Sequence, residues 1–169
     1  NELFYSPRKS KIILNVGGIA NYSYVKNKNH LWGSDVGTGN ALMDAYCQKY
    51  LNKPFDKDGK IASKGKVNSR ELRKLLLHKF FKQKFPKSTG KELFNLNMLS
   101  KQFLKESPEN ILATLVEFTA ISVDKSIKAN NHTFDEFIVC GGGGKNKFLI
   151  KRLAGILNNE VILSNAYGY

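Results

Sequence analysis

One carboxylate stands in a glycine-rich stretch where it could act as a base. Asp35 lies in GSDVGTGN (33–40), and the helical-looking segment ALMDAYCQKY follows directly. Open α/β sheets bind ligands at the carboxyl ends of their strands, so on a rigid turn there Asp35 could take a proton from a reacting group. The alternative is ordinary turn or capping chemistry, which is the usual role of an isolated aspartate.

Glycine-rich turns follow three predicted strands: NVGGIAN (15–21), SDVGTGN (34–40) and CGGGGKN (140–146). Glycine lets a backbone approach a ligand closely, and a helix that begins just after such a turn offers free amides to an anion. Each turn alone is equally well explained as a plain tight turn. The third is not a P-loop, because Asn146 follows Lys145. Three such turns together favour an anion site.

Other polar groups allow less specific interpretations. PKSTG (86–90) combines a cation with two hydroxyls and a glycine, so it could hold a sugar or a phosphate, or could simply be a loop. DKDG (56–59) begins like a calcium loop but lacks its spacing and closing glutamate, which favours a turn. The two cysteines and three histidines are scattered along the chain, so we expect no metal site.

The formal net charge of +13 raises the possibility of nucleic-acid binding. The lysines, however, are spread over nearly every segment, and the densest patches alternate with apolar residues at helical spacing. That pattern is typical of solvated helix faces. A basic, non-catalytic binding module for nucleic acid or anionic glycans is therefore the alternative hypothesis, and we expect neither nucleic acid nor membrane as a partner.

Length and composition favour a single domain, since 41% of the 169 residues are hydrophobic. No apolar run approaches the roughly 18 residues of a membrane span, and NELFYSPRKSK (1–11) lacks the regions of a signal peptide. We therefore expect a cytoplasmic protein. Because the first residue is Asn rather than Met, the sequence is expected to begin inside a longer gene product.

The elements that must position these residues begin with strands. KIILNVGG (11–18) and YSYVK (22–26) flank a glycine-containing turn and predict a β-hairpin. A third short strand is expected near HLWGSD (30–35), leading into the turn that carries Asp35. The first two glycine-rich turns therefore lie at strand ends.

Helices are expected in the middle of the chain. Apolar residues at helical spacing predict a helix over 41–51, with Asn40 able to cap its free amides. A second helix is predicted over 70–81, and a shorter one over about 95–105. The segment 107–128 begins with a serine cap and a proline at the first helical position, and is the longest predicted helix.

The last part of the chain has the pattern of a βαβ unit. FDEFIVC (134–140) predicts a strand, the third glycine-rich turn follows, NKFLIKRLAGILN (146–158) predicts a helix, and EVILSN (160–165) predicts another strand. Such a unit implies a parallel pair with a right-handed crossover. A hairpin followed by helices and a βαβ unit predicts a layered α/β domain.

Together and in this order, these stretches resemble the anhydro-N-acetylmuramic acid kinases, in the sugar-kinase, actin and acetate-kinase superfamily. The resemblance is carried by NVGGIAN (15–21), SDVGTGNALMDAYCQKYLNKPFDKDG (34–59), SKGKVN (63–68), PKSTGKELFN (86–95), ATLVEFTA (113–120) and VCGGGGKN (139–146). It implies a ribonuclease-H-like (actin-like ATPase) domain, with a mixed sheet and flanking helices. Residues 1–169 would be the carboxyl-terminal domain of a two-domain kinase, without its amino-terminal domain and final helix.

The resemblance also implies an activity. Enzymes of this family transfer the γ-phosphoryl group of ATP, with Mg²⁺, while water opens the 1,6-anhydro ring of the sugar. The product is N-acetylmuramic acid 6-phosphate, and the pathway is peptidoglycan recycling. The implied partners are the missing amino-terminal domain, the sugar substrate and a second copy in a homodimer, and the isolated chain is expected to be inactive.

The family's site residues can be carried over to matching positions. Asp35 matches the catalytic base, and the family usually has Thr and Pro where this chain has Val36 and Thr38. The ATP-binding turns match Gly17, Gly18, Gly141, Gly142 and Gly143. The substrate contacts that the resemblance implies are Asn21, Gly37, Asn40, Lys87, Ser88 and Thr89.

Overall fold

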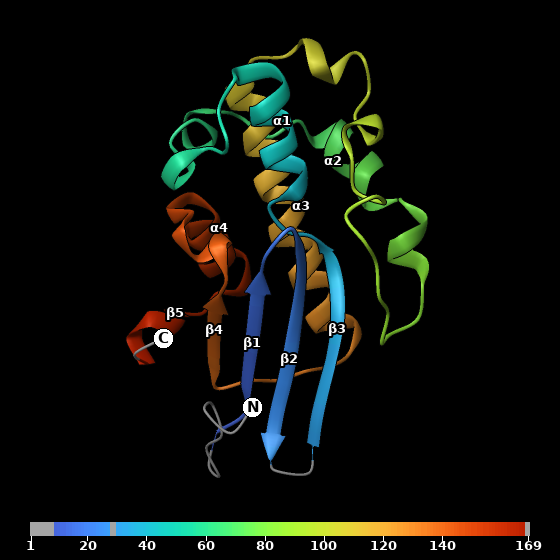
Figure 1. Ribbon diagram of the computed structural model, residues 1–169. Coiled ribbons are helices and arrows are strands. Elements are labelled where there is room, and N and C mark those ends of the chain that lie inside the picture. The colour runs from blue at the N-terminus through green and yellow to red at the C-terminus, as the bar shows by residue number, and fades with distance from the viewer. Residues whose placement is uncertain (1–8, 28–29, 168–169) are drawn as a thin grey trace.

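The computed structural model describes residues 9–27 and 30–167 of the chain. Its centre is a mixed sheet of five strands in the order β3-β2-β1-β4-β5 (Figure 1). The strands are β1 Lys11–Val16, β2 Ile19–Asn27, β3 His30–Thr38, β4 Glu136–Cys140 and β5 Val161–Leu163. The first three are antiparallel neighbours, and β4 joins parallel to β1, with β5 parallel to β4. The predicted hairpin, parallel pair and α/β class are confirmed.

Strand β1 shows why this sequence forms a sheet with one covered face. Ile12, Leu14 and Val16 are fully buried, whereas Ile13 and Asn15 between them are only partly buried. Successive side chains of a strand point to opposite faces, so the alternation assigns the three buried residues to one face. Their branched shapes suit a pleated, buried surface. This face packs against the helices.

Strand β3 is longer than the sequence predicts, and this changes the place of Asp35. The strand runs to Thr38, and Asp35 is paired with Asn21 of β2 beside a register shift. The prediction that Asp35 lies on the turn itself is therefore wrong. Hydrogen bonds from both sides keep the segment extended, because the Asp35 amide also donates to Lys87 O at 3.0 Å. The bend comes at Gly39 and Asn40.

The helices gather over one face of the sheet and beyond the carboxyl ends of β1, β3 and β4 (Figure 1). The longest helix begins as predicted, with Pro108 in its first turn and Ser107 Oγ accepting from Asn110 N. It contacts each of the other three helices. The helices are α1 Ala41–Leu51, α2 Ser69–Leu76, α3 Pro108–Ala129 and α4 Lys147–Leu157.

One predicted helix is shorter than expected, and another is replaced by 3-10 turns. The helix predicted over 70–81 ends at Leu76, and Lys79–Lys82 form a separate 3-10 turn whose Phe80 amide donates to His78 Nδ1. The helix predicted over 95–105 is replaced by two 3-10 turns, because Ser100 N and Oγ both donate to the buried Glu71 carboxylate at 2.8 Å. The 3-10 turns are η2 Lys57–Gly59, η3 Ala62–Lys64, η4 Lys79–Lys82, η5 Leu96–Met98, η6 Phe103–Lys105, η7 Gly142–Lys145 and η8 Ser164–Tyr167.

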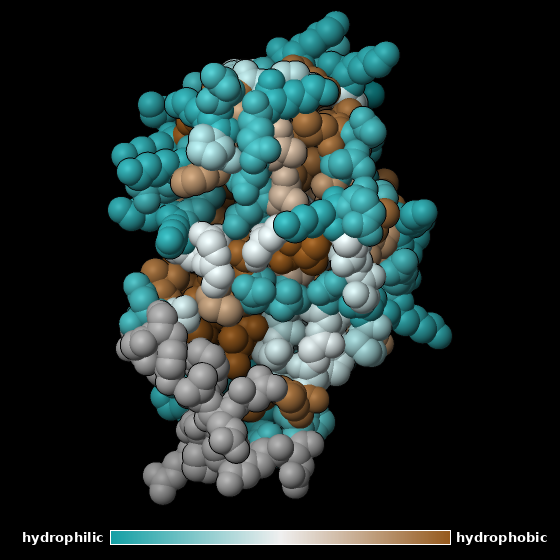
Figure 2. Space-filling view, viewed as in Figure 1, coloured by the Kyte–Doolittle hydropathy of each residue, from teal (hydrophilic) through white to brown (hydrophobic). Residues whose placement is uncertain are grey.

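The core lies between the sheet and α3, whose Leu115 and Phe118 are buried, and the Phe118 ring packs against Phe81. Hydrophilic residues cover most of the face that Figure 2 shows, above all over the helices and loops of its upper half. Among residues 9–27 and 30–167, no helix is long and apolar enough to span a bilayer.

Candidate functional site

The three glycine-rich turns meet at one end of the sheet, where β1, β3 and β4 end. The amide of Gly39 donates to Gly18 O at 2.9 Å, and that of Asn40 donates to Gly17 O at 2.8 Å. The third turn packs against the end of β1, since a Cβ on Gly141 would lie 2.9 Å from Val16 O. Turns that are far apart in the sequence therefore lie side by side in the fold.

Close packing requires glycine at several of these positions, and one position faces open space. A Cβ on Gly39 would clash with Gly17 O, and a Cβ on Gly143 would clash with the Val16 side chain. Gly141 has a φ of +80°, which side-chain-bearing residues rarely adopt. A Cβ on Gly142, in contrast, would meet only Asn40 Nδ2, at 3.7 Å. Gly142 therefore leaves room for a ligand.

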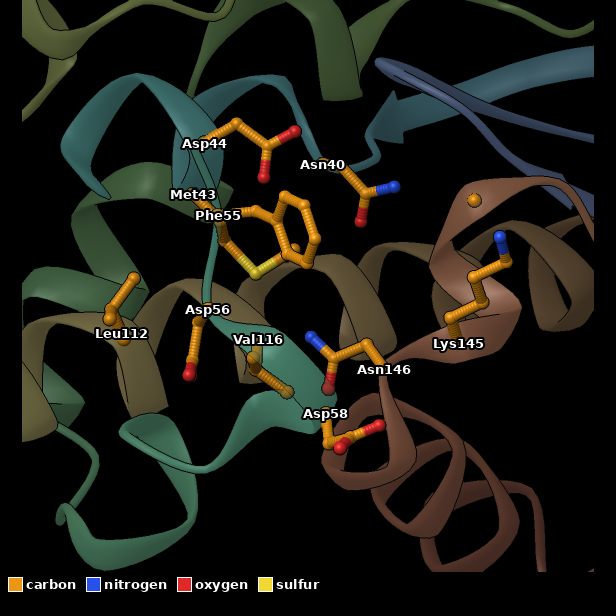
Figure 3. Close-up of a pocket in the computed structure, with 11 residues that line it drawn as sticks. Asn40, Met43, Asp44, Phe55, Asp56, Asp58, Leu112, Val116, Lys145 and Asn146 are labelled. Atoms are coloured by element: carbon orange, nitrogen blue, oxygen red, sulfur yellow. The ribbon is translucent and has the colours of Figure 1, made fainter. Parts of the chain in front are cut away.

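A cavity of about 270 Å³ lies beside Gly142 (Figure 3). Met43, Leu112 and Val116 supply apolar lining from α1 and α3. Phe55 also lines the cavity and is 53% exposed. The polar lining residues are Asn40, Asp44, Asp56, Asp58, Lys145 and Asn146. An apolar lining with a few polar groups is typical of pockets for organic ligands.

The loop beneath this cavity is held by its own aspartate. Both carboxylate oxygens of Asp56 accept hydrogen bonds from backbone amides, from Ile61 N at 2.9 Å and Ala62 N at 2.9 Å. Both oxygens of the Asp56 carboxylate are therefore engaged in stabilising the loop. The prediction that DKDG (56–59) is a turn is therefore confirmed.

A second, more open groove of about 510 Å³ adjoins the first cavity. Asn40 and Asp44 line both, so the two spaces meet at the beginning of α1. Burial raises the pKa of Asp44, and the positive charge of Lys91 lowers it in part. The groove is lined by Gly17, Gly18, Asn40, Ala41, Asp44, Ala45, Gln48, Lys91, Phe94 and Asn95.

Asp35 lies at the edge of the sheet, close to the loop that follows α2. Its Oδ2 accepts a hydrogen bond of 2.8 Å from Thr89 N, and Ser34 Oγ accepts one of 2.9 Å from Lys87 N. The loop thus pairs with β3 much as another strand would. The Asp35 carboxylate is partly buried and makes no ion pair within the described residues. Asp35 is not among the residues that line the two cavities described above.

With this geometry in place, comparisons with known proteins decide the family. The family described as anhydro-N-acetylmuramic acid kinase matches residues 1–169. The chain belongs to this family.

Curated relatives named anhydro-N-acetylmuramic acid kinase support the assignment. The protein of Gamma-proteobacterium EBAC31A08 is 56% identical over 169 residues, which are 100% of this chain and 46% of that protein. The protein of Pseudomonas syringae pv. syringae is 40% identical over 98% of this chain and 47% of its own length. The protein of Pasteurella multocida is 42% identical over 98% of this chain and 45% of its own length. The chain spans about half the length of these relatives.

Solved structures show the fold. The activator of 2-hydroxyisocaproyl-CoA dehydratase from Clostridium difficile, solved with bound ADPNP, is 16% identical and has a TM-score of 0.60, over 95% of this chain and 55% of its own. Component A of (R)-2-hydroxyglutaryl-CoA dehydratase from Acidaminococcus fermentans is 14% identical, also with a TM-score of 0.60, over 95% of this chain and 56% of its own. The actin-like ATPase fold expected from the sequence is confirmed.

The structure places the residues implied by the family resemblance in different surroundings. Asn21 and Thr89 lie beside Asp35, and Asn40 lines both cavities. Gly37, in contrast, packs under the helices, where its Cβ would lie 3.2 Å from Ser122 Cβ. Packing is the role that the geometry supports for Gly37.

Lys87 and Ser88 occupy two sides of the same loop. The Lys87 ammonium lies 4.1 Å from the ring centre of Phe85 and 4.4 Å from that of Phe80, and donates to Phe80 O at 3.0 Å. Burial lowers its pKa. The Ser88 side chain is exposed. Lys87 therefore fastens the loop through its aromatic neighbours as well as its backbone.

The predicted capping role of Asn40 is wrong. Its side chain makes no capping hydrogen bond to α1, and Nδ2 donates to Val16 O at 3.4 Å instead. The reason is that Asn40 has helical backbone angles, φ −86° and ψ −17°, whereas a capping residue is usually extended. The side chain joins the end of β1 to the beginning of α1.

The lining residues that the sequence did not single out include Asp44, Phe55 and Lys91. Phe55 and Asp44 belong to stretches that carry the family resemblance, and Lys91 follows PKSTG directly. The feature of the sequence that could have identified them is their position within or next to the family motifs. Nothing in their spacing predicts that two of them line the same cavity.

Proposed function

We propose that this chain supplies about half of an anhydro-N-acetylmuramic acid kinase, as its carboxyl-terminal domain. The enzyme uses ATP and Mg²⁺ to open 1,6-anhydro-N-acetylmuramic acid with water and to phosphorylate O6, in cytoplasmic peptidoglycan recycling. Relatives named anhydro-N-acetylmuramic acid kinase, at 56%, 42% and 40% identity, support the activity. The observation that carries the proposal is the meeting of the three glycine-rich turns beside two adjoining cavities.

The two cavities suit the two ends of ATP. The apolar surface of Met43, Leu112 and Val116 suits the adenine, and the open position at Gly142 admits the ribose. The triphosphate would then pass Asn40 toward Gly17 and Gly18, in the direction of the second groove. The dehydratase activator with bound ADPNP supports the use of a nucleotide by this fold.

The beginning of α1 fits a magnesium ion. Carboxylate oxygens are preferred Mg²⁺ ligands, and Asp44 lies where the two cavities meet. Asp44 would hold the ion directly or through water, and the ion, when bound, would neutralise charge on the phosphates. Asn40 and Asp44 would therefore orient the phosphate chain where the two cavities meet.

Asp35 suffices as the only acid–base group of the reaction. Glycoside hydrolysis normally needs one carboxyl group to activate water and another to protonate the leaving oxygen. In the proposed reaction, O6 receives the phosphoryl group instead of a proton. Water bonds to the anomeric carbon and gives its proton to Asp35, the bond from that carbon to O6 breaks, and ADP leaves as O6 is phosphorylated. One carboxylate is enough for this sequence of bond changes.

The test uses a chimera: the EBAC31A08 relative in which this chain replaces the 169 matching residues. We expect the chimera to form ADP only when anhydro sugar is present, and to yield a phosphorylated, ring-opened product by mass spectrometry. The chain by itself should form none, because residues outside it complete the site. A chimera that is folded but shows no sugar-dependent ADP would contradict the proposal.

A further inference from the structure

Lys91 lies over the first glycine-rich turn. A Cβ on Gly18 would clash with Cε of Lys91 and would lie 3.1 Å from its Nζ. The end of the lysine side chain therefore rests on the backbone of the turn, in space that glycine leaves free. A larger residue at position 18 would push the ammonium group away.

The charge of Lys91 is available to a ligand. Lys91 is an exposed residue of the second groove, where it is the only cation among the described lining residues. Within the described residues, no carboxylate lies within ion-pair distance of it. Its charge nevertheless lowers the pKa of Asp44 across the groove. Lys87 differs, because its ammonium is engaged by Phe80 and Phe85.

The same loop also holds Asp35. Thr89 N donates to Asp35 Oδ2, and Lys91 reaches Gly18 from a position two residues further along. One short segment thus contacts both the carboxylate and the glycine-rich turn. Because the loop is fixed to β3 through Lys87, the two contacts have a defined separation.

We propose that Lys91 is a catalytic residue that binds the phosphoryl group in transfer at the turn of Gly17 and Gly18. This inference rests on the proposed use of ATP. A lysine ammonium binds phosphate oxygens as a point charge, and phosphoryl transfer depends on cations that stabilise the spread negative charge. Residues 87–91 then orient the Asp35 carboxylate through Thr89 and place the Lys91 ammonium at the turn of Gly17 and Gly18.

The experiment compares four forms of the chimera: unchanged, Lys91→Gln, Lys91→Arg and Lys125→Gln. Lys125 is an exposed lysine on α3 and lines neither cavity, so its variant controls for net charge. We expect Lys91→Gln to lower kcat on the order of 100-fold, the usual loss for one charge-stabilising donor, with KM for the sugar within about twofold. Lys91→Arg should restore most of the rate, and Lys125→Gln should match the unchanged protein.

A binding measurement separates this inference from the proposed function. In calorimetric titrations of the full chain, Lys91→Gln should weaken binding of Mg-ATP at least about fivefold and leave binding of AMP unchanged, because only ATP reaches the turn. An inactive chimera with this ATP-specific loss would overturn the kinase proposal and keep the phosphate site. Equal ATP affinity and kcat within about threefold in Lys91→Gln would overturn the role of Lys91. Equal affinities of the unchanged chain for Mg-ATP and AMP would also contradict the proposed role of Lys91.

Discussion

The backbone amide of Thr89 donates a hydrogen bond of 2.8 Å to Oδ2 of Asp35. This bond joins the edge of the sheet to a loop that lies 54 positions further along the chain. It holds the carboxylate in one orientation and occupies one of its two oxygens. Orientation of this kind is what general-base catalysis requires, since the base must stay within hydrogen-bond reach of the proton.

Loss of the Asp35 charge should stop catalysis without unfolding the protein. We expect Asp35→Asn to lower kcat of the chimera by roughly 100-fold or more, the usual effect of removing a general base. Its thermal midpoint should stay close to the original, because asparagine can still accept from Thr89 N. The control is Glu160→Gln, at an exposed position before β5. A loss of less than about fivefold would show that Asp35 is not the base.

Removal of the Thr89 amide hydrogen should reduce kcat, because that amide orients the Asp35 carboxylate. Proline has no amide hydrogen, so Thr89→Pro removes the bond, whereas Thr89→Ala retains it. Hydrogen bonds to charged groups contribute about 1.5–3 kcal/mol, which corresponds to a loss of roughly tenfold or more in kcat. Steady-state kinetics of both chimeras provide the measurement. Equal rates for the two variants would mean that this bond does not position the base.

Phe55 should contribute to nucleotide affinity and little to stability. Its ring lines the first cavity but is 53% exposed, so Phe55→Ala removes little buried area. Stacking of a base on an aromatic ring is worth about 1–3 kcal/mol, so we expect KM for ATP to rise at least about fivefold. Leu77→Ala, at a 71% exposed leucine outside the cavity, is the control. Unchanged KM for ATP in Phe55→Ala would place the base elsewhere.

Exchanging Val and Thr at positions 36 and 38 of β3 should change the free energy of unfolding in opposite directions. Thr38 Oγ1 is buried and has no hydrogen-bond partner among the described residues, whereas Val36 packs in the core at 1% exposure. A buried unsatisfied hydroxyl costs about 1–3 kcal/mol. Thr38→Val should therefore raise the free energy of unfolding by about 1 kcal/mol, and Val36→Thr should lower it by a similar amount. Urea denaturation of the chain measures both, and a stabilising Val36→Thr would contradict the packing argument.

The chain should lose stability in mild acid through His132. Its ring stacks on Tyr24 at 4.0 Å, and Nδ1 shares a hydrogen bond of 3.0 Å with the hydroxyl of Tyr22. Burial raises the pKa of Tyr22 to about 12, so that hydroxyl stays protonated and is able to donate to a neutral His132 ring. Burial, and then the charge of His30, lower the pKa of His132 below 6.5. The neutral ring is the form that the fold favours.

The sign of this effect follows from proton binding. The unfolded chain binds a proton at His132 more readily than the folded chain does. The contribution of the neutral His132 to the free energy of unfolding is therefore fully present above pH 6.5, and it declines as the pH falls from 6.5 toward the lower pKa of His132 in the folded chain. Urea midpoints at pH 8 and pH 5.5 should differ more for the unchanged chain than for His132→Phe. His78 shifts in the same direction, so His78→Gln is a useful second comparison. Identical pH dependence with and without His132 would contradict the prediction.

Much of the fold follows from short-range patterns. The alternation of Ile12, Leu14 and Val16 assigns one face of β1, and Ser107 with Pro108 marks the beginning of α3. These features depend on residues within a few positions of one another. Local backbone preferences and side-chain periodicity are enough to determine them.

Other boundaries depend on distant partners. Ser100 is held in a 3-10 region by Glu71, and β3 continues through Asp35 because Lys87 O accepts from its outer edge. The sequence pattern of glycines around Asp35 indicates a bend, but hydrogen bonds on both edges keep the segment extended. Such contacts override local preference and leave no local signal.

For the site, the sequence by itself determined the family and the glycine-rich turns, because those motifs are short and contiguous. Only the tertiary structure decided that Asp44 joins two cavities, that Thr89 holds Asp35, and that Lys91 rests on Gly18. The physical reason is that these contacts lie between segments brought together when the sheet and helices pack. Their distances are set by the whole fold rather than by spacing along the chain.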